Sequence, residues 1–495
     1  MKMKITIPTN HNFYEERPLS FESESCRSDD DYCHFYSDNG KIVETFNDKI
    51  KSLFEGQYLI TKKDLEKYRD LVVSKIERKK GFDVEDRLIL KLYAKTCKGG
   101  DKYYIQTGLY TGVIHLTTNK TTYTFNIIPE CGNFFLNRML NMMNHIYINN
   151  DILKSKCESS ENPFIYIIYY LFVNALDKAR VLGYPQQYKL KKEKNKSFHG
   201  SLDINRFINQ DIPFCGKISI IFPQRETIQE IIDVLYSALK KVEKSNLLNS
   251  KVKKLLSEIK PYYSGKYCTK NKINAALKSS ALNNPIFMLF KKALKYAEII
   301  LQDMDLSQTS SQTSLGISGY LIDISEVWEI YLENLLSLNL PGWTVMGQER
   351  LPFYKTNFWF RDFMPDLVLK KNEDDIYAVF DAKFKHMEGR NKDVDRNDLH
   401  QIHNYAGYYS RRGTLKACGL LYPCFLSNER ESSIEHDWHS GIYNQDSQTK
   451  FIIDGVNIDP IKELSLKKQL DDSSTWDCLI KEEQNFIDRI RNALI

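Results

Sequence analysis

The chain has 495 residues, too many for a single hydrophobic core, and this length predicts roughly three domains. Hydrophobic residues make up 42% and charged residues 27%, with 22 Gly and 14 Pro, which excludes a fibrous or largely disordered protein. The 69 basic and 64 acidic residues leave a net charge of +5, so any contact with nucleic acid must come from local clusters of basic residues.

Neither secretion nor membrane insertion is expected. The ten cysteines form no C-x-x-C pair and no Cys/His set at zinc-finger spacing, which is typical of reduced thiols. The start, MKMKITIPTNHNFYEERPLS, lacks the apolar region of a signal peptide, and the apolar stretch 164–176 is too short to span a bilayer. We therefore expect a cytoplasmic protein with no membrane partner.

Residues 1–95 are predicted to form a β-rich element followed by helices. Short strand-like pieces such as KITI and QYLI are separated by turn signals, and Asp38-Asn39-Gly40 favours a hairpin. The charged segment 62–95 has helical periodicity, which predicts one or two exposed helices with a break at 79–81.

Residues 96–305 are predicted to form a β-sheet followed by a helical region that binds a partner. Alternating polarity over 103–129 predicts three strands. Helices are predicted where apolar residues recur at three- and four-residue spacing, in FFLNRMLNMMNHIYI, PFIYIIYYLFVNALDKARVLG, RETIQEIIDVLYSALKKVEKS and NNPIFMLFKKALKYAEIILQDM. Between them, 198–212 is predicted to be a hairpin or an extended arm, and the basic run 189–196 a solvated loop, unless it lies at the tip of an arm that contacts DNA or a partner.

Residues 306–495 are predicted to form the last domain. The polar stretch from Asp305 to Gly319, rich in Ser, Thr and Gln, fits a linker or a flexible loop, so the domain would begin near Gly319. Strands and helices follow, which gives the whole chain an α/β and α+β multidomain architecture.

An acid and a base lie two residues apart in the otherwise apolar run IYAVFDAKFK, at Asp381 and Lys383. Alternation along a strand places both on one face, although a lone Asp-x-Lys pair is usually a surface ion pair on an edge strand. Asp366 opens the preceding strand, and the polar turn KKNEDD connects the two. Antiparallel pairing would therefore bring all three side chains together.

A helix is predicted on each side of these strands. Upstream, LIDISEVWEIYLENLLSL carries Glu326, Glu329 and Glu333 along one side; any of them could be solvated, and one can face the strands. Downstream, DLHQIHNYAGYYSRRG places Gln401 and Tyr405 four residues apart on the same side.

The residues in this order suit phosphodiester hydrolysis, which needs hard oxygen ligands for Mg²⁺. We expect Asp366, Asp381 and the backbone carbonyl of Ala382 to bind Mg²⁺, with Mn²⁺ as an alternative, and Glu329 to bind directly or through water. Lys383 would orient or activate the attacking water and neutralise charge on phosphorus.

Gln401 and Tyr405 would hold either the DNA backbone or the side chain of Lys383. Pro365-Asp366 followed by Asp381-Ala382-Lys383 resembles the PD-(D/E)xK nuclease superfamily, and Gln401-x-x-x-Tyr405 is similar to its RecB-like members. This resemblance implies a restriction-endonuclease-like α/β core, with a mixed sheet flanked by helices, and DNA endonuclease activity.

The upstream chain resembles the McrC subunits of modification-dependent restriction systems. GLYTGVIHL and FNIIPECG resemble their small β-region, FHGSLDI their Gly-x-hydrophobic-Asp segment and Trp328-Glu329 their aromatic-Glu pair. The resemblance covers 103–422 and departs from the family pattern at Glu130, where Lys is usual, and at His199, where Arg is usual.

The resemblance to McrC implies an Mg²⁺-dependent endonuclease subunit that cleaves foreign or modified DNA in defence. It also implies a partner similar to McrB, a GTP-hydrolysing AAA+ ring that translocates DNA and that this subunit stimulates. The sequence itself contains no Gly-x-x-x-x-Gly-Lys-Ser/Thr loop, so motor activity would have to come from another protein. Two alternatives stay open: an activator or scaffold of an AAA+ ring, and a stand-alone nuclease of repair or recombination.

Overall fold

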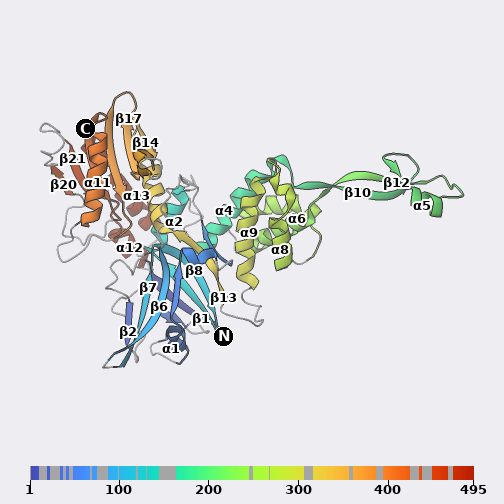
Figure 1. Ribbon diagram of the computed structural model, residues 1–495, viewed down its shortest axis with the longest axis horizontal. Helices are drawn as coiled ribbons and strands as arrows, with labels where there is room; N and C mark the ends of the chain where they lie inside the picture. The colour runs from blue at the N-terminus through green and yellow to red at the C-terminus, as the bar shows by residue number, and fades with distance from the viewer. Residues whose placement is uncertain are drawn as a thin grey trace. The chain divides into compact units, whose positions relative to one another are not determined.

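The computed structural model describes most of the chain and is drawn in Figure 1. The described residues are 2–9, 19–22, 34–36, 41–43, 48–66, 70–74, 87–97, 100–118, 121–129, 131–143, 163–244, 249–266, 268–305, 316–355, 360–385, 394–423, 434–437, 449–466 and 472–495. Among them, no helix combines the length and the apolar character needed to cross a membrane.

The chain divides into two compact units, one formed by Met1–Ser159 with Gln312–Ile495 and the other by Ser160–Ser311. The second unit is thus inserted, in sequence, between two parts of the first. The predicted division into 1–95, 96–305 and 306–495 is drawn differently, since 96–305 includes residues of both units, and it stays a prediction.

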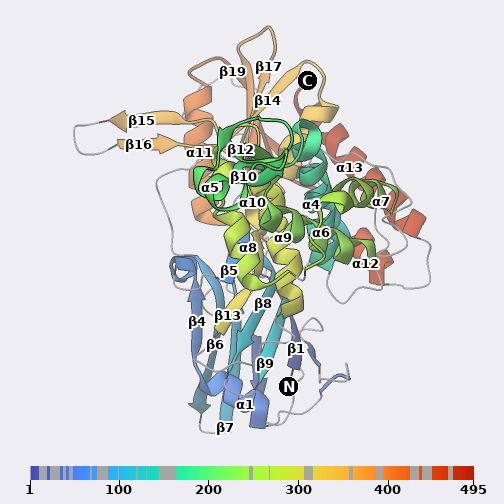
Figure 2. The same cartoon turned by 90° about the vertical axis from the view of Figure 1, so that its right-hand side faces the viewer.

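The amino-terminal part of the first unit consists of two sheets packed around one core (Figure 2). The six-stranded sheet has the order β3 (His34–Tyr36), β1 (Lys2–Pro8), β9 (Thr122–Ile128), β8 (Tyr110–Thr117), β13 (Gly316–Asp323), β5 (Asp70–Ser74). The four-stranded sheet has the order β2 (Leu19–Glu22), β7 (Gly100–Thr107), β6 (Leu88–Cys97), β4 (Tyr58–Thr61). Helix α1 (Asp48–Glu55) adds Ile50, Leu53 and Phe54 to the core.

The three strands predicted over 103–129 are confirmed as β7, β8 and β9. The exposed helices predicted over 62–95 are wrong, because the described residues there form a short 3₁₀ helix, Lys63–Glu66, and the strands β5 and β6. LILKLYA also alternates in polarity, and pairing with β7 buries Leu90 and Leu92 in the core. The turn 38–40 and the break at 79–81 lie outside the described residues, although an antiparallel bridge joins Tyr36 to Ile42.

Strand β13 joins this sheet from far along the sequence. It pairs antiparallel with β8 and parallel with β5, so Gly319, predicted to open the last domain, lies inside a strand of the amino-terminal sheet. Gly112 and Gly319 have φ of +142° and +151°, and a Cβ on either would lie 2.1 Å from a carbonyl oxygen of the facing strand. Glycine is therefore needed at both positions.

The second unit is a group of helices from which a β-arm runs out (Figure 1). The predicted helices are confirmed as α4 (Pro163–Ala179), α6 (Gln229–Lys244) and α9 (Leu289–Asp305) here, and as α2 (Gly132–Met143) in the first unit. The helices α7 (Asn249–Ile259) and α8 (Lys270–Leu277) were not predicted. The arm is an antiparallel pair, β10 (Gln186–Asn195) with β12 (Ile218–Thr227), and carries β11 (Ser201–Leu202) and α5 (Ile204–Gln210). The arm prediction is confirmed, but the basic run 189–196 is a strand of it and not a loop.

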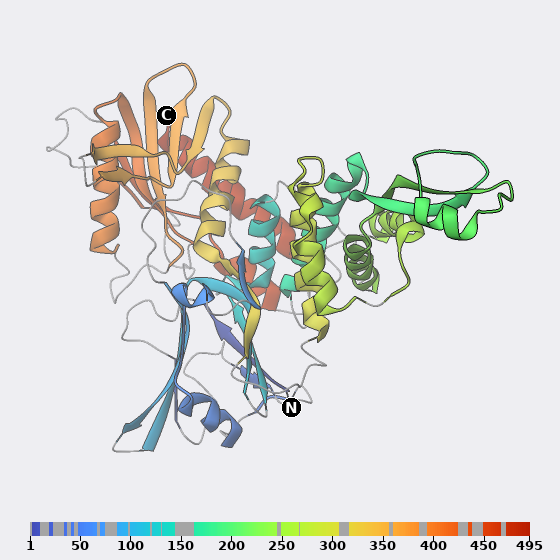
Figure 3. The same ribbon diagram turned by 45° about the vertical axis from the view of Figure 1, so that its right-hand side comes forward.

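The carboxyl-terminal part of the first unit is a six-stranded mixed sheet. Its order is β14 (Trp343–Gly347), β17 (Leu367–Lys371), β18 (Ile376–Ala382), β19 (Thr414–Leu421), β21 (Lys450–Asp454), β20 (Ile434–Asp437). Helices α10 (Ile324–Asn339) and α11 (Arg396–Tyr409) lie on opposite sides of it (Figure 3), and α12 (Asp459–Leu466) and α13 (Asp472–Ala493) follow the last strand. A two-stranded hairpin, β15 (Leu351–Lys355) with β16 (Phe360–Phe363), and helix α2 (Gly132–Met143), packed on α10, complete the unit.

Candidate active site

Asp381 lies near the carboxyl end of β18, in the middle of the mixed sheet. Strand β18 pairs antiparallel with β17 and parallel with β19, and the Asp381 side chain is fully buried. The interpretation of Asp381 and Lys383 as a surface ion pair on an edge strand is therefore wrong. A charge at the centre of a sheet is costly unless something compensates it.

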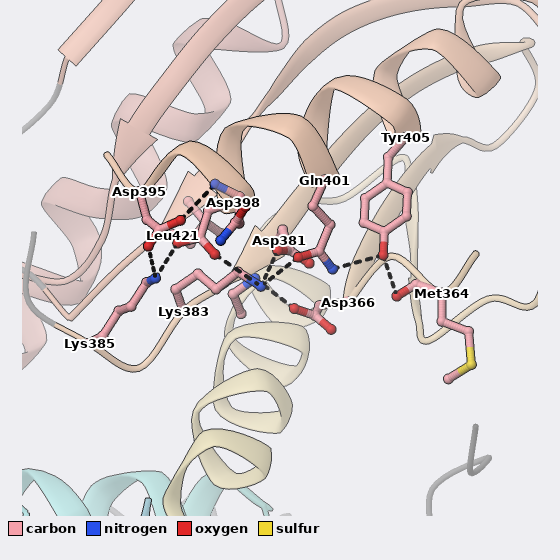
Figure 4. Close-up of polar contacts among 12 residues, drawn as sticks. Met364, Asp366, Asp381, Lys383, Lys385, Asp395, Asp398, Gln401, Tyr405 and Leu421 are labelled. Atoms are coloured by element: carbon pink, nitrogen blue, oxygen red, sulfur yellow. Dashed lines mark hydrogen bonds and ion pairs between the residues drawn. The ribbon is translucent and has the colours of Figure 1, made fainter. Parts of the chain in front are cut away.

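A second carboxylate lies beside Asp381. Asp366 immediately precedes β17, the predicted antiparallel partner, and its Oδ2 accepts a hydrogen bond of 2.9 Å from the Ala382 backbone N–H (Figure 4). Removal from water raises the pKa of Asp366 well above its usual range, and the nearby carboxylates of Asp381 and Glu329 raise it further. The contribution of these two carboxylates is like-charge repulsion, which a bound cation would relieve.

The oxygens of Asp381 are not satisfied by hydrogen bonds. Within the described part of the chain neither carboxylate oxygen has a hydrogen-bond donor, although Oδ2 lies 2.5 Å from the Nζ of Lys383 as an ion pair. Buried acceptors are nearly always paired, so a carboxylate whose two oxygens meet only one ammonium group indicates a place for a further cation or a water.

Lys383 connects the carboxylates to helix α11. Its Nζ donates a hydrogen bond of 3.0 Å to Oε1 of Gln401 and lies 3.8 Å from Oδ1 of Asp398. Burial lowers the pKa of Lys383, but the carboxylates of Asp381 and Asp366 outweigh burial and raise the pKa above its usual range. The side chain is thus a cation at neutral pH, suited to neutralising charge and to orienting a water.

Gln401 and Tyr405 continue this chain of hydrogen bonds (Figure 4). Gln401 Nε2 donates to the Tyr405 hydroxyl at 3.0 Å, and that hydroxyl donates to the Met364 carbonyl at 3.2 Å. Of the two positions foreseen for this pair, the structure places it on the Lys383 side. Because Met364 lies two residues before Asp366, these hydrogen bonds link the Lys383 side of β18 to the start of β17 through α11.

Glu329 is the glutamate of helix α10 whose charge raises the pKa of Asp366. Its Oε2 accepts a hydrogen bond of 3.0 Å from Gln348 Nε2, and its charge contributes to the raised pKa of Asp366. Glu326 contributes to the raised pKa of Tyr110, and Glu333 lies against Gly347. The structure thus brings together Asp366, Asp381, Lys383, Glu329, Gln401 and Tyr405.

Residues 105–423 match the family described as McrBC 5-methylcytosine restriction system component. The chain belongs to this family. The resemblance stated from sequence over 103–422 is thereby confirmed, and the chain is an McrC-like member of an McrBC restriction system. The comparison with curated proteins gave no match.

Two solved structures are similar to this McrBC-family chain. One is a refined half-complex from a tetradecameric assembly of Thermococcus gammatolerans McrB AAA+ hexamers with bound McrC, at 14% identity and a TM-score of 0.47, covering 81% of this chain and 85% of that chain. The other is the T. gammatolerans McrBC complex, at 15% identity and a TM-score of 0.33, covering 68% of this chain and 88% of that chain.

The sequence did not single out Gln348, which touches two residues of the site in this McrBC-family chain. Its backbone N–H donates to the Asp366 carbonyl at 3.2 Å, while its side chain holds Glu329. Its φ of +49° is uncommon for a residue other than glycine, and such conformations concentrate at functional sites. No signal in the sequence reveals a positive φ at a glutamine.

Asp398 was also missed. Its Oδ2 lies 2.6 Å from Lys385 Nζ and accepts a hydrogen bond of 3.3 Å from the Tyr422 hydroxyl, while its Oδ1 lies near Lys383. Helical spacing offered a signal, because Asp398 precedes Gln401 by three residues and shares its side of α11.

The donors present fit Mg²⁺, although no group of three or more His, Cys, Asp or Glu in the described ranges is arranged as a metal cluster. Sites for Mg²⁺ in proteins commonly supply one or two carboxylates and leave the remaining positions to water and substrate phosphates. The two adjacent carboxylates of Asp366 and Asp381, with unpaired oxygens on Asp381, meet that description.

Proposed function

We propose that this chain is the Mg²⁺-dependent DNA endonuclease subunit of its McrBC restriction system, with Mn²⁺ as an alternative metal. The observation that carries the proposal is the adjacent carboxylate pair of Asp366 and the buried Asp381, with no hydrogen-bond donor on either Asp381 oxygen apart from the ion-paired, cationic Lys383. Nuclease chemistry would reside in 306–495, the part predicted to have the restriction-endonuclease-like core of the PD-(D/E)xK superfamily.

Asp366, Asp381 and the Ala382 carbonyl would hold the metal, with Glu329 binding directly or through water. The metal would supply charge stabilisation at phosphorus and polarise an attacking water. Lys383, charged and fixed by Gln401, would orient that water and offset the negative charge that builds up on the phosphate. Tyr405 would keep Gln401 in place through its hydroxyl.

We further propose that the chain acts in the cytoplasm with an AAA+ NTPase ring similar to McrB, which would translocate the DNA. The sequence contains no phosphate-binding loop of its own, and the arm of the second unit is unusually apolar on its surface. The exposed side chains there include Tyr188, Leu190, Phe198, Ile204, Ile208 and Phe214, each at least 58% exposed. Exposed apolar patches of this kind mark protein contacts, and we assign this one to the ring.

Plasmid cleavage in Mg²⁺, with and without the neighbouring NTPase, tests the proposal. We expect Asp381→Ala and Lys383→Ala each to abolish cutting, because one removes a metal ligand and the other the cation that faces the phosphate. A matched control is the surface pair Lys370 and Asp375, 3.3 Å apart, whose alanine variants should cut as wild type.

Each outcome separates the alternatives. Cutting that survives both site variants would refute the nuclease centre and leave an activator of the ring. Cutting that never depends on the NTPase would indicate a stand-alone nuclease.

A further inference from the structure

A group of lysines and tyrosines lies on the four-stranded amino-terminal sheet, away from the nuclease residues. Along β6, Leu90 and Leu92 point into the core, so Lys91, Tyr93 and Lys95 share the opposite face. Strands β6 and β7 lie side by side (Figure 2).

Tyr104 of β7 lies directly opposite Tyr93 and shares its face. We call Lys91, Tyr93, Lys95 and Tyr104 the Lys–Tyr strip. Lys102, opposite Lys95, is left out, because Glu22 of β2 lies opposite it on its other side.

The two tyrosine rings of the strip contact the ammonium groups of both lysines. Tyr93 and Tyr104 stack with ring centroids 4.9 Å apart and an interplanar angle of 14°. Lys91 Nζ lies 5.0 Å from the Tyr93 centroid, and Lys95 Nζ lies 5.5 Å from Tyr93 and 5.7 Å from Tyr104. Two positive charges are thus held at one aromatic pair by cation–π attraction.

These charges have no carboxylate partner among the residues that the structure describes. In the described ranges neither Lys91 nor Lys95 forms an ion pair with a carboxylate, and Lys95 is exposed to solvent. Two contacts of the same kind elsewhere are balanced by a carboxylate: in one, Lys370 over Tyr377 pairs with Asp375 at 3.3 Å.

Arg412 over Tyr408 likewise pairs with Glu349, at 3.7 Å. Two adjacent cations that meet no carboxylate in the described part of the chain are complementary to an anionic ligand.

We infer that the Lys–Tyr strip is a DNA-binding surface that contacts the phosphate backbone, a second contact for the DNA on which the proposed nuclease acts. The inference rests on that proposed function only for the identity of the nucleic acid. Lysine contacts to phosphates carry no base information, so the strip would hold DNA of any sequence. A chain with a net charge of only +5 needs such local clusters to bind DNA at all.

Fluorescence anisotropy with a short labelled DNA duplex, in EDTA so that no cutting occurs, tests the inference. Lys91→Glu with Lys95→Glu should weaken binding by about tenfold or more and lower the salt dependence by roughly two ionic contacts. The control is Lys253→Glu with Lys254→Glu, an exposed pair on α7 that makes the same change in net charge and should bind as wild type.

Equal binding by wild type and the strip variant would overturn the inference, as would equal weakening in the control. Thermal melts establish that the variants fold. If the glutamate variant does not fold, Lys91→Gln with Lys95→Gln decides the matter, with weaker binding again expected.

Asp381→Asn separates this inference from the proposed function. Cutting in Mg²⁺ should be lost, while adding Lys91→Glu and Lys95→Glu to this variant should still weaken binding in EDTA by about tenfold or more. A wild-type chain that binds through the strip but never cuts would refute the nuclease and leave the strip standing. A chain that cuts, but binds equally well without the two lysines, would refute the strip alone.

Discussion

Two buried aspartates of the carboxyl-terminal sheet, Asp381 and Asp454, differ in the partners that compensate their charge. Asp454, at the end of β21, accepts two hydrogen bonds from the Arg489 guanidinium, at 2.8 and 2.9 Å. It also accepts one from the Gly455 backbone N–H at 2.7 Å. Asp381 on β18, two strands away, has no hydrogen-bond donor among the described residues and meets Lys383 only as an ion pair. Burial is common to both, so burial does not distinguish the carboxylate proposed to bind metal; its lack of hydrogen-bond donors does.

The largest effect on stability is expected from substituting the two aspartates in parallel. Asp454→Asn leaves the Arg489 charge uncompensated and should lower the free energy of unfolding by about 3 kcal/mol. Asp381→Asn removes one partner of Lys383, which keeps Gln401 at 3.0 Å and Asp398 at 3.8 Å, and should leave stability within about 1 kcal/mol of wild type. Urea unfolding of metal-free protein measures both.

The comparison would fail if Asp381→Asn proved the more destabilising of the two. Asp381 would then be a structural charge like Asp454, and its unpaired oxygens would say nothing about a metal.

A smaller effect is expected at Gln348, which we regard as a positioning residue for Glu329. Gln348→Ala removes the hydrogen bond to Glu329 and should reduce cleavage about tenfold while raising the Mg²⁺ concentration for half-maximal cutting. Gln348→Gly removes the same bond but suits the φ of +49°, so it should be the more stable of the two and no more active. A glycine variant that restores cleavage would show that Gln348 matters only for the backbone.

The smallest effect is expected from pH in the absence of metal. The pKa of Asp366 is raised in the folded chain, so the folded state holds this proton more tightly than the unfolded state. The resulting stability is fully present below the ordinary aspartate pKa, about 4, and is lost as pH rises through the raised pKa. Asp366→Asn should remove this part of the pH dependence, which unfolding titrations from acid to neutral pH would detect. An unchanged profile would contradict the carboxylate pairing.

Much of the site could be read from the sequence because its signals are local. Alternation along IYAVFDAKFK and the turn KKNEDD predicted the antiparallel pair β17 and β18 that brings Asp366 to Asp381. The four-residue spacing of Gln401 and Tyr405 predicted that both lie on one side of a helix, and on that side Gln401 bonds to both Lys383 and Tyr405. The pairing of adjacent strands and the faces of helices depend on the nearest few residues. These features can therefore be predicted without knowledge of the rest of the fold.

Only the tertiary structure decided what depends on distant partners. The segment LILKLYA fits helical and alternating periodicity alike. Pairing with β7 makes it a strand, and the alternation of that strand places Lys91 and Tyr93 on one face. Strand β13 entered the amino-terminal sheet beside β8, from about two hundred residues away in sequence, because two glycines let the backbones approach. Local sequence fixes which side chains alternate, but not which strand comes alongside, since that choice depends on the free energy of the whole packed core.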